Sequence, residues 1–204
     1  MKKLVVILDP AHGNDVAGKR SPDNTHFEYI WSRCISTLIA QKLKAKGFRV
    51  EYTSTEIKEI GLSKRKQNAN NIRIDAGEVK FLLSIHNNAS TIEGWGKAKG
   101  FEIYTHIGKS NSDIFADIIM EKLMKAFPKE DGYLYRLDLS DGDYDKENNF
   151  TVLMGSYSAV LLEWLFMDNR SDLKKIKDAS INYKLANTLV DAIVEIQNYL
   201  NKTS

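Results

Sequence analysis

The sequence predicts a single-domain α/β fold over residues 1–204, built around a largely parallel sheet with helices on its faces. Three short runs of apolar and β-branched residues, at 4–8, 79–85 and 158–162, have the composition of strands buried on both faces. Segments with apolar residues at helical spacing lie between and after these runs, and this alternation is typical of a parallel sheet. No internal repeat, low-complexity segment or linker marks a second domain.

The composition is that of an ordinary globular protein with a sizeable core. Hydrophobic residues make up 43% of the 204 positions and charged residues 27%. The formal net charge of +2 gives no electrostatic ground for binding nucleic acid or a membrane surface. The one cysteine, Cys34, excludes an internal disulfide and a cysteine-rich zinc site, so a metal site would use carboxylates and the four histidines.

The first strand is predicted at 4–8 and delivers a histidine at its carboxyl end. Pro10 should end this strand, because proline cannot donate a hydrogen bond to the sheet. Small and turn-forming residues then place His12 in a tight loop. Ligands bind at the carboxyl edge of open α/β sheets, so His12 is either a functional residue or an ordinary polar surface residue.

A helix is predicted over 27–43, where apolar residues recur at helical spacing. Cys34 lies on this apolar stripe and is expected in the core. Thr25 and Glu28 have the spacing of a capping box, so Glu28 either caps the helix or is available to bind a ligand. His26 is expected at the surface, facing outward from the start of the helix.

Further elements follow from the same two periodicities. They are strands at 48–53, 101–105 and 150–154, and helices at 62–72 with a stop at Gly77, at 114–123 closed by Pro128, and at 181–200. The stretch between Thr91 and Gly100 is expected to be a loop. The strand at 79–85 ends in His86, and the strand at 158–162 ends in Glu163.

The least regular stretch, 129–149, is acidic and has alternating aspartates from Asp141 to Asp145. This pattern suggests a calcium loop, but an EF-hand would need glycine and glutamate where Lys146 and Val152 stand. We therefore expect a solvated loop that could border a site.

Four side chains could meet at one edge of the sheet. His12, His86 and Glu163 each follow a predicted strand, and Glu28 lies in the first turn of a helix. Two histidines and a carboxylate, with one position left open, are the composition of a catalytic zinc site. We assign His12, Glu28 and His86 as ligands of one zinc ion, and Glu163 as the general base and acid that moves a proton from water to a leaving amine.

Milder interpretations of these residues exist. Glu28 could only cap its helix, and Glu163 could be a carboxylate satisfied by a neighbouring arginine. However, a carboxylate after an apolar strand lies low in a cleft, where a raised pKa suits acid–base chemistry. His106, which follows the strand at 101–105, is the reserve ligand.

These residues resemble the amidase 3 family of zinc-dependent N-acetylmuramoyl-L-alanine amidases, and the resemblance runs from about residue 4 to about residue 200. The opening motif of that family is similar to the residues around His12, and its glutamate ligand to Glu28. Its helix motif is similar to Leu62, Arg65, Ala69 and Asn70, its second histidine motif to Ser84–Ala89, and its catalytic glutamate to Glu163, followed by Asn169.

The chain departs from the family pattern at positions that would touch substrate. The family usually has glycine at the positions of Ala11, Asn14 and Leu165, and arginine at the position of Met154. The stretch from 129 to 150 aligns poorly. None of these departures affects the proposed metal ligands, so they leave the substrate contacts open.

The resemblance implies hydrolysis of the amide between the lactyl group of N-acetylmuramic acid and the L-alanine of the stem peptide of peptidoglycan. It also implies one zinc ion and a mixed, mostly parallel six-stranded sheet flanked by helices, of the phosphorylase/hydrolase-like kind. The six strand-like segments agree with that sheet. The expected partner is peptidoglycan, bound by a monomer, with no nucleic acid and no membrane involved.

The setting implied by the resemblance is the cell wall. The apolar run after Met-Lys-Lys is too short for a signal peptide, so we expect export by another route, release by a phage as an endolysin, or a truncated form of an exported autolysin. Two alternative functions are another zinc peptidase or deacylase of wall peptides, and a non-catalytic peptidoglycan-binding module. The second would have no need of Glu163 as a base.

Overall fold

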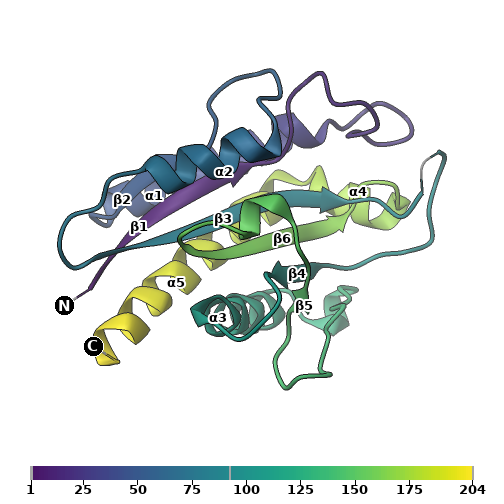
Figure 1. Ribbon diagram of the computed structural model, residues 1–204. Coiled ribbons are helices and arrows are strands. Elements are labelled where there is room, and N and C mark those ends of the chain that lie inside the picture. Colours follow the sequence, from purple (N-terminus) through teal and green to yellow (C-terminus); the bar gives the residue numbers. More distant parts are fainter. Residues whose placement is uncertain (1, 92, 204) are drawn as a thin grey trace.

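Six strands form one sheet in the order β2-β1-β3-β6-β4-β5 in the computed structural model, which describes residues 2–91 and 93–203 (Figure 1). Their bounds are β1 Lys3–Pro10, β2 Arg49–Tyr52, β3 Glu78–Asn88, β4 Glu102–Thr105, β5 Lys146–Glu147 and β6 Ser158–Phe166. Strands β2, β1, β3 and β6 run parallel, β4 is antiparallel to β6, and β5 is parallel to β4. The predicted mixed, mostly parallel sheet is confirmed.

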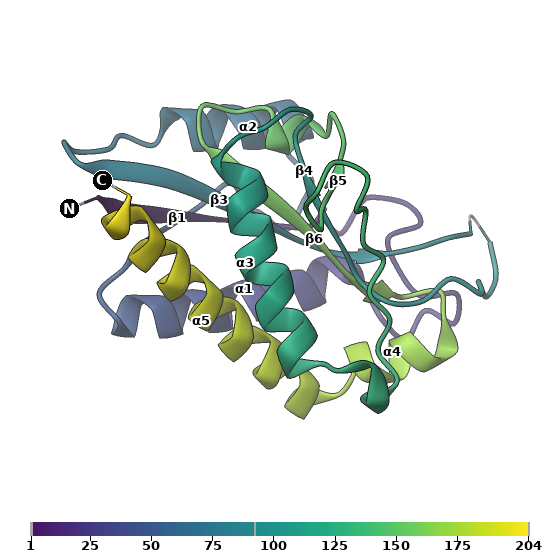
Figure 2. The same cartoon turned by 90° about the horizontal axis from the view of Figure 1, so that it is seen from below.

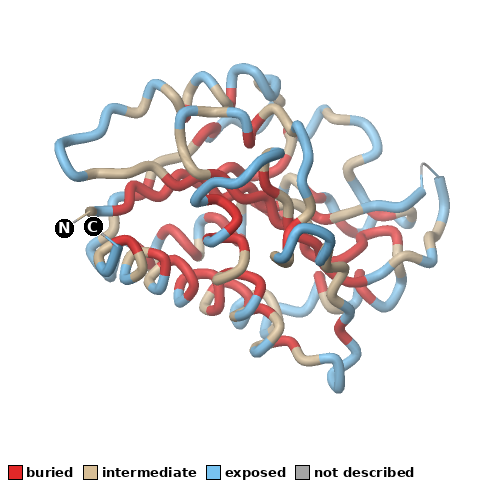
Figure 3. The backbone as a smooth tube through the Cα atoms, turned by 60° about the horizontal axis from the view of Figure 1, so that its bottom comes forward, coloured by how far each residue is buried: buried red, intermediate tan, exposed pale blue. Residues whose placement is uncertain are grey.

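Helices cover the two faces of the sheet unequally. The helices are α1 Glu28–Ala45, α2 Leu62–Asn71, α3 Asn111–Ala126, α4 Arg170–Ile176 and α5 Ala179–Lys202. Residues of α1, α3 and α5 pack in the larger core cluster, and Figure 2, which views the molecule from below, shows α3 and α5 in front of the sheet. The other face carries α2 and a short 3-10 turn at Thr151–Leu153, with a smaller core cluster. Figure 3 shows the buried strands between these layers.

Strand periodicity decides which side chains reach the thinly covered face. On β3, Leu83 and Ile85 belong to the larger core, whereas Leu82 belongs to the smaller one. Successive strand side chains alternate between faces, so His86 lies on the face that carries α2. By the same alternation Glu163 joins it there, because Leu162 belongs to the larger core.

The structure corrects three predicted boundaries. Strand β1 continues through Pro10, which pairs with Ile85, and α2 ends at Asn71 and not near Gly77. The segment expected as a strand at 150–154 is a 3-10 turn, and the fifth strand lies earlier, at Lys146–Glu147. The apolar residues of the 150–154 segment pack on the smaller core from the 3-10 turn. Their pattern therefore reflects burial and not pairing with a neighbouring strand.

Two predicted environments are also wrong. Cys34 is exposed, because the buried stripe of α1 runs through Trp31, Ile35 and Ile39 and leaves Cys34 on the outer side. The stretch 129–149 is not a solvated loop throughout: Asp145 is 2% exposed and accepts a hydrogen bond from the Thr105 hydroxyl at 2.6 Å.

Three positions lie outside the described residues. They are residues 1, 92 and 204, so one position of the predicted 91–100 loop and the first residue of the Met-Lys-Lys start are not described. Within the described part, no helix combines the length and the apolar character that crossing a membrane requires.

Candidate metal centre

The sheet brings the predicted strand-end residues together. Strands β1, β3 and β6 are neighbours and run in the same direction, so their carboxyl ends share one edge. His86 pairs in register with Glu163. His12 follows β1 by two residues and adopts a positive φ of 46°, which turns the chain immediately after the strand. The prediction that these strands are parallel neighbours is confirmed.

His12, Glu28 and His86 form a tight cluster. The Glu28 carboxylate places Oε1 3.0 Å from His86 Nδ1 and Oε2 3.6 Å from His12 Nε2. The two imidazole rings are 5.0 Å apart and almost perpendicular. One ligand atom from each side chain lies within 4.8 Å of the other two, and no other group of three histidines, cysteines or carboxylates in the described residues meets this criterion.

Glu28 does not cap its helix. The residue at the helix N-cap is Phe27, which offers no side-chain hydrogen bond, and the Thr25 hydroxyl instead bonds to Asp23 at 2.8 Å. The Glu28 carboxylate is fully buried and accepts a hydrogen bond from the Asn87 backbone N–H at 3.1 Å. The helix begins too late for the capping-box spacing to apply, so the carboxylate is directed at β3.

The donor set fits a zinc ion. Glu28 Oε2 is buried and has no hydrogen-bond partner, which is a costly state unless a cation accompanies it. Burial lowers the pKa of His12 to about 4, so its imidazole is neutral at pH 7, as a metal ligand must be. Burial alone would raise the pKa of Glu28, but its hydrogen bond to His86 and the charges of both histidines lower it, so this carboxylate is ionised. Two imidazoles and one carboxylate are donors that zinc uses in catalytic sites.

Glu163 stands beside this cluster as a separate carboxylate. Its Oε2 is buried without a hydrogen-bond partner. Burial raises its pKa to about 7; the negative charge of Glu28 adds to this effect and the charge of His86 opposes it. No arginine pairs with Glu163 in the described part of the chain, since the arginine ion pairs there go to other carboxylates. A carboxyl group with a pKa near neutrality can both accept and donate a proton.

Two other histidines differ from expectation. His26 is 7% exposed and not at the surface: its Nε2 lies 2.8 Å from Asn87 Oδ1, and the Asn87 amide donates to the Trp164 carbonyl at 2.6 Å. This chain of bonds ties the loop before α1 to β3 and β6. His106, the reserve ligand, lies outside the cluster, because β4 is antiparallel to β6 and ends at the opposite edge.

A buried ion pair supports the loop that carries His12. Arg65 of α2 donates to Asp9 at 3.0 Å and to the Pro10 carbonyl. It also donates to Glu59 at 2.9 Å, and the Ser84 hydroxyl donates to Asp9 at 2.6 Å. Arg65 thus fixes the end of β1 just before the histidine. Sequence reasoning placed Arg65 on a helix face but gave no signal for this partner.

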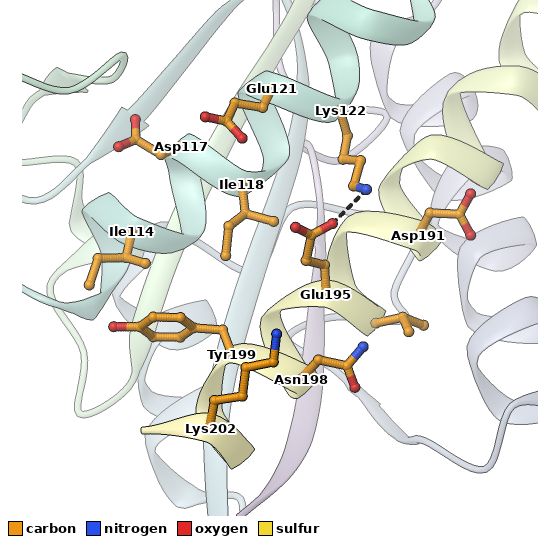
Figure 4. A pocket seen from close by; sticks show the side chains of 11 residues that line it. Ile114, Asp117, Ile118, Glu121, Lys122, Asp191, Glu195, Asn198, Tyr199 and Lys202 are labelled. Carbon is orange, nitrogen blue, oxygen red and sulfur yellow. Dashed lines mark ion pairs between the residues drawn. The ribbon is translucent and has the colours of Figure 1, made fainter. Parts of the chain in front are cut away.

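The hollow between α3 and α5 is separate from this site. Figure 4 shows its walls, with an ion pair between Lys122 and Glu195 bridging the two helices. These helices cover the opposite face of the sheet from His86 and Glu163, and the hollow shares no residue with the cluster.

The α/β sheet carries a cluster of three potential metal ligands beside a carboxyl group that can transfer protons, and this combination is typical of a metal-dependent hydrolase. The family model described as N-acetylmuramoyl-L-alanine amidase matches residues 6–195, and the chain belongs to this amidase 3 family. The resemblance seen in the sequence is confirmed, and membership identifies the chain as an enzyme of the peptidoglycan amidase class.

Solved structures share the whole fold. An N-acetylmuramoyl-L-alanine amidase from Clostridium difficile 630 is 24% identical, with 100% of both chains covered and a TM-score of 0.78. The catalytic domain of the amidase CwlV from Bacillus (Paenibacillus) polymyxa var. colistinus is 23% identical, with 98% of both chains covered and a TM-score of 0.74. The catalytic domain of the CD27L endolysin, which targets Clostridia difficile, is 18% identical, with 95% of this chain and 97% of that one covered and a TM-score of 0.67. No curated protein gives a significant sequence match.

Proposed function

We propose that the chain hydrolyses the amide between N-acetylmuramic acid and L-alanine in peptidoglycan with one zinc ion. His12, Glu28 and His86 hold the ion, and Glu163 is the general base and acid. The observation that carries the proposal is the cluster of three ligand atoms within 4.8 Å, with Glu163 in register with His86 on the next strand. Family membership supplies the class of bond.

The chain's own residues perform the proton transfers. Zinc at such a site supplies Lewis-acid chemistry that activates water and polarises a carbonyl. Glu163, with its pKa raised to about 7, accepts the proton of the attacking water and then delivers it to the alanine nitrogen as the amide breaks. The Asn87 N–H and His26 keep the Glu28 carboxylate and its loop in position during these steps.

The buried Glu163 supports catalysis over the alternative of a wall-binding module. Binding alone needs no buried carboxylate with an unpartnered oxygen, and such a group costs stability. The alternative of another zinc peptidase or deacylase shares all four residues, so the bond that is cleaved distinguishes the two.

We propose the cell wall as the place of action and wall lysis or remodelling as the role. The similarity to both bacterial amidases and an endolysin catalytic domain supports this role without choosing between a host autolysin and a phage endolysin. The chain acts as a monomer on peptidoglycan, without nucleic acid or membrane as partner. Its net charge of +2 supports the absence of a nucleic-acid partner.

Product analysis tests the bond. Purified peptidoglycan is digested with the zinc-loaded protein, new amino groups are labelled, and the fragments are identified by mass spectrometry. The expected products are peptides that begin with L-alanine and glycans whose N-acetylmuramic acid units carry free lactyl carboxylates. Fragments cut at any other peptide bond would support the alternative peptidase.

A further inference from the structure

A second buried glutamate lies directly across from Glu163. Strand β4 lies beside the antiparallel strand β6 (Figure 1), and Glu102 of β4 pairs in register with Glu163 of β6. Directly opposed residues of antiparallel strands point to the same face with their Cβ atoms about 4.5–5.5 Å apart. Glu102 is 3% exposed, and it accepts hydrogen bonds from the Asn88 amide at 2.8 Å and the Tyr104 hydroxyl at 2.9 Å. It therefore forms the wall of the site next to the proposed acid–base residue.

Two cations converge on this one carboxylate. Arg136 donates from Nε to Glu102 Oε1 at 2.8 Å, and Lys146 donates to the other oxygen. Their side chains remain 37% and 26% exposed, whereas the Glu102 side chain is 4% exposed. One carboxylate cannot neutralise two cations, so Glu102, Arg136 and Lys146 together carry one net positive charge.

The outer part of the Arg136 guanidinium has no hydrogen-bond acceptor among the described residues. Among the described residues, only Nε of Arg136 makes a side-chain hydrogen bond, and its planar group lies 5.3 Å from the Phe166 ring centroid. The N–H donors of its two terminal nitrogens bond to no group in the part of the chain that the structure describes. A planar pair of N–H donors matches the two oxygens of a carboxylate, and the adjacent Lys146 adds a point charge.

We propose that Arg136 and Lys146 form a subsite that binds a carboxylate on the stem-peptide residue next to L-alanine. This inference rests on the proposed function, because it places the alanine nitrogen at Glu163. The next residue of the peptide has its Cα about 3.8 Å beyond that of alanine. That reach is similar to the spacing between the opposed positions of Glu163 and Glu102, so the residue arrives at this wall.

This subsite gives a role to the stretch 129–149, which supplies both cations. Glu102 is the positioning residue here. Its ion pairs hold Arg136 and Lys146 next to the register position of Glu163, on the thinly covered face of the sheet. A purely structural ion cluster would have the same contacts. It would differ in one respect: it would make the enzyme indifferent to the charge of the peptide.

The test compares two synthetic, uncross-linked glycan strands. In one, the second stem residue is glutamic acid with a free α-carboxylate; in the other that carboxylate is converted to the neutral amide. Hydrogen bonds between charged groups are worth about 1.5–3 kcal/mol, so the wild-type protein should prefer the free acid by about 10- to 100-fold in kcat/KM. The preference should appear mainly in KM, because the contact is equal in the ground and transition states.

Arg136→Gln should bring the ratio of kcat/KM on the free-acid strand to kcat/KM on the amidated strand close to 1. Arg73→Gln is the matched control. Arg73 is exposed in the loop between α2 and the start of β3, at the edge of the sheet opposite to the site. Equal cleavage of both strands by the wild type, or a preference that survives in Arg136→Gln, would overturn the subsite and leave the proposed function intact. Cleavage of neither strand by the zinc-loaded wild type would overturn the proposed function itself.

Discussion

Replacing Glu163 by glutamine keeps the shape of the side chain and removes its titrating proton. General acid–base catalysis contributes about 10²- to 10⁴-fold to a rate. At 1.36 kcal/mol per tenfold, Glu163→Gln should therefore raise the barrier by about 3–5 kcal/mol. Zinc should still bind, because the three proposed ligands are unchanged.

The same substitution should lower activity but raise the stability of the metal-free protein at neutral pH. Burial raises the pKa of Glu163 from 4.5 to about 7, so the folded chain binds this proton more tightly than the unfolded chain. Wild-type stability from this group is present below pH 4.5 and is lost as pH rises through 7. The loss corresponds to about 3 kcal/mol at 1.36 kcal/mol per pH unit. Glutamine does not titrate, so the metal-free variant gains stability relative to the wild type between pH 5 and pH 8.

Denaturant unfolding of the metal-free proteins at pH 5 and pH 8 measures the stability difference. Turnover on peptidoglycan measures the loss of catalytic rate. Glu121→Gln, on the exposed side of α3, is the matched control and should change neither quantity. Turnover within tenfold of the wild type would refute the role of Glu163. A stability difference that does not vary with pH would refute the buried, proton-holding carboxyl.

Three further predictions concern the support of the site and the rest of the fold. His86→Ala should lose bound zinc, and full metal content by elemental analysis would contradict its assignment. Arg65→Met should cost about 3–5 kcal/mol in denaturant unfolding, because it leaves the buried Asp9 without its cation; a change below 1 kcal/mol would contradict this. Burial and the neighbouring aspartates raise the pKa of Asp145 from 3.8 to about 7, so wild-type stability from this group falls as pH rises from 4 to 7. Asp145→Asn should therefore be more stable than the wild type at pH 8 and similar at pH 4, and equal effects at both pH values would be inconsistent with that shift.

Local sequence patterns were sufficient to predict the edge where the site lies. The runs before His12, His86 and Glu163 are strongly apolar, and parallel strands bring their carboxyl ends together. The position of Glu28 was predictable in the sequence but its hydrogen bonds were not, because the capping-box pattern and a ligand use the same side-chain oxygens.

Long-range contacts account for most of the errors. The burial of His26 depends on Asn87, which is 61 positions away, and no periodicity in the loop before α1 indicates that partner. The antiparallel direction of β4, which removes His106 from the site, is equally invisible in a short apolar run. Cys34 was misplaced because it borders the apolar stripe of α1, where a small rotation of the helix decides between core and solvent.

Zinc-dependent amide hydrolysis is measured directly by the release of alanine amino groups from purified peptidoglycan, with and without a metal chelator. The wild-type chain should release alanine amino groups, lose this activity when the chelator is present, and recover it when zinc is added back. Release that is unaffected by removal of all metal would contradict the role of His12, Glu28 and His86 as holders of the catalytic ion. No release from zinc-loaded protein would contradict the proposed amidase activity.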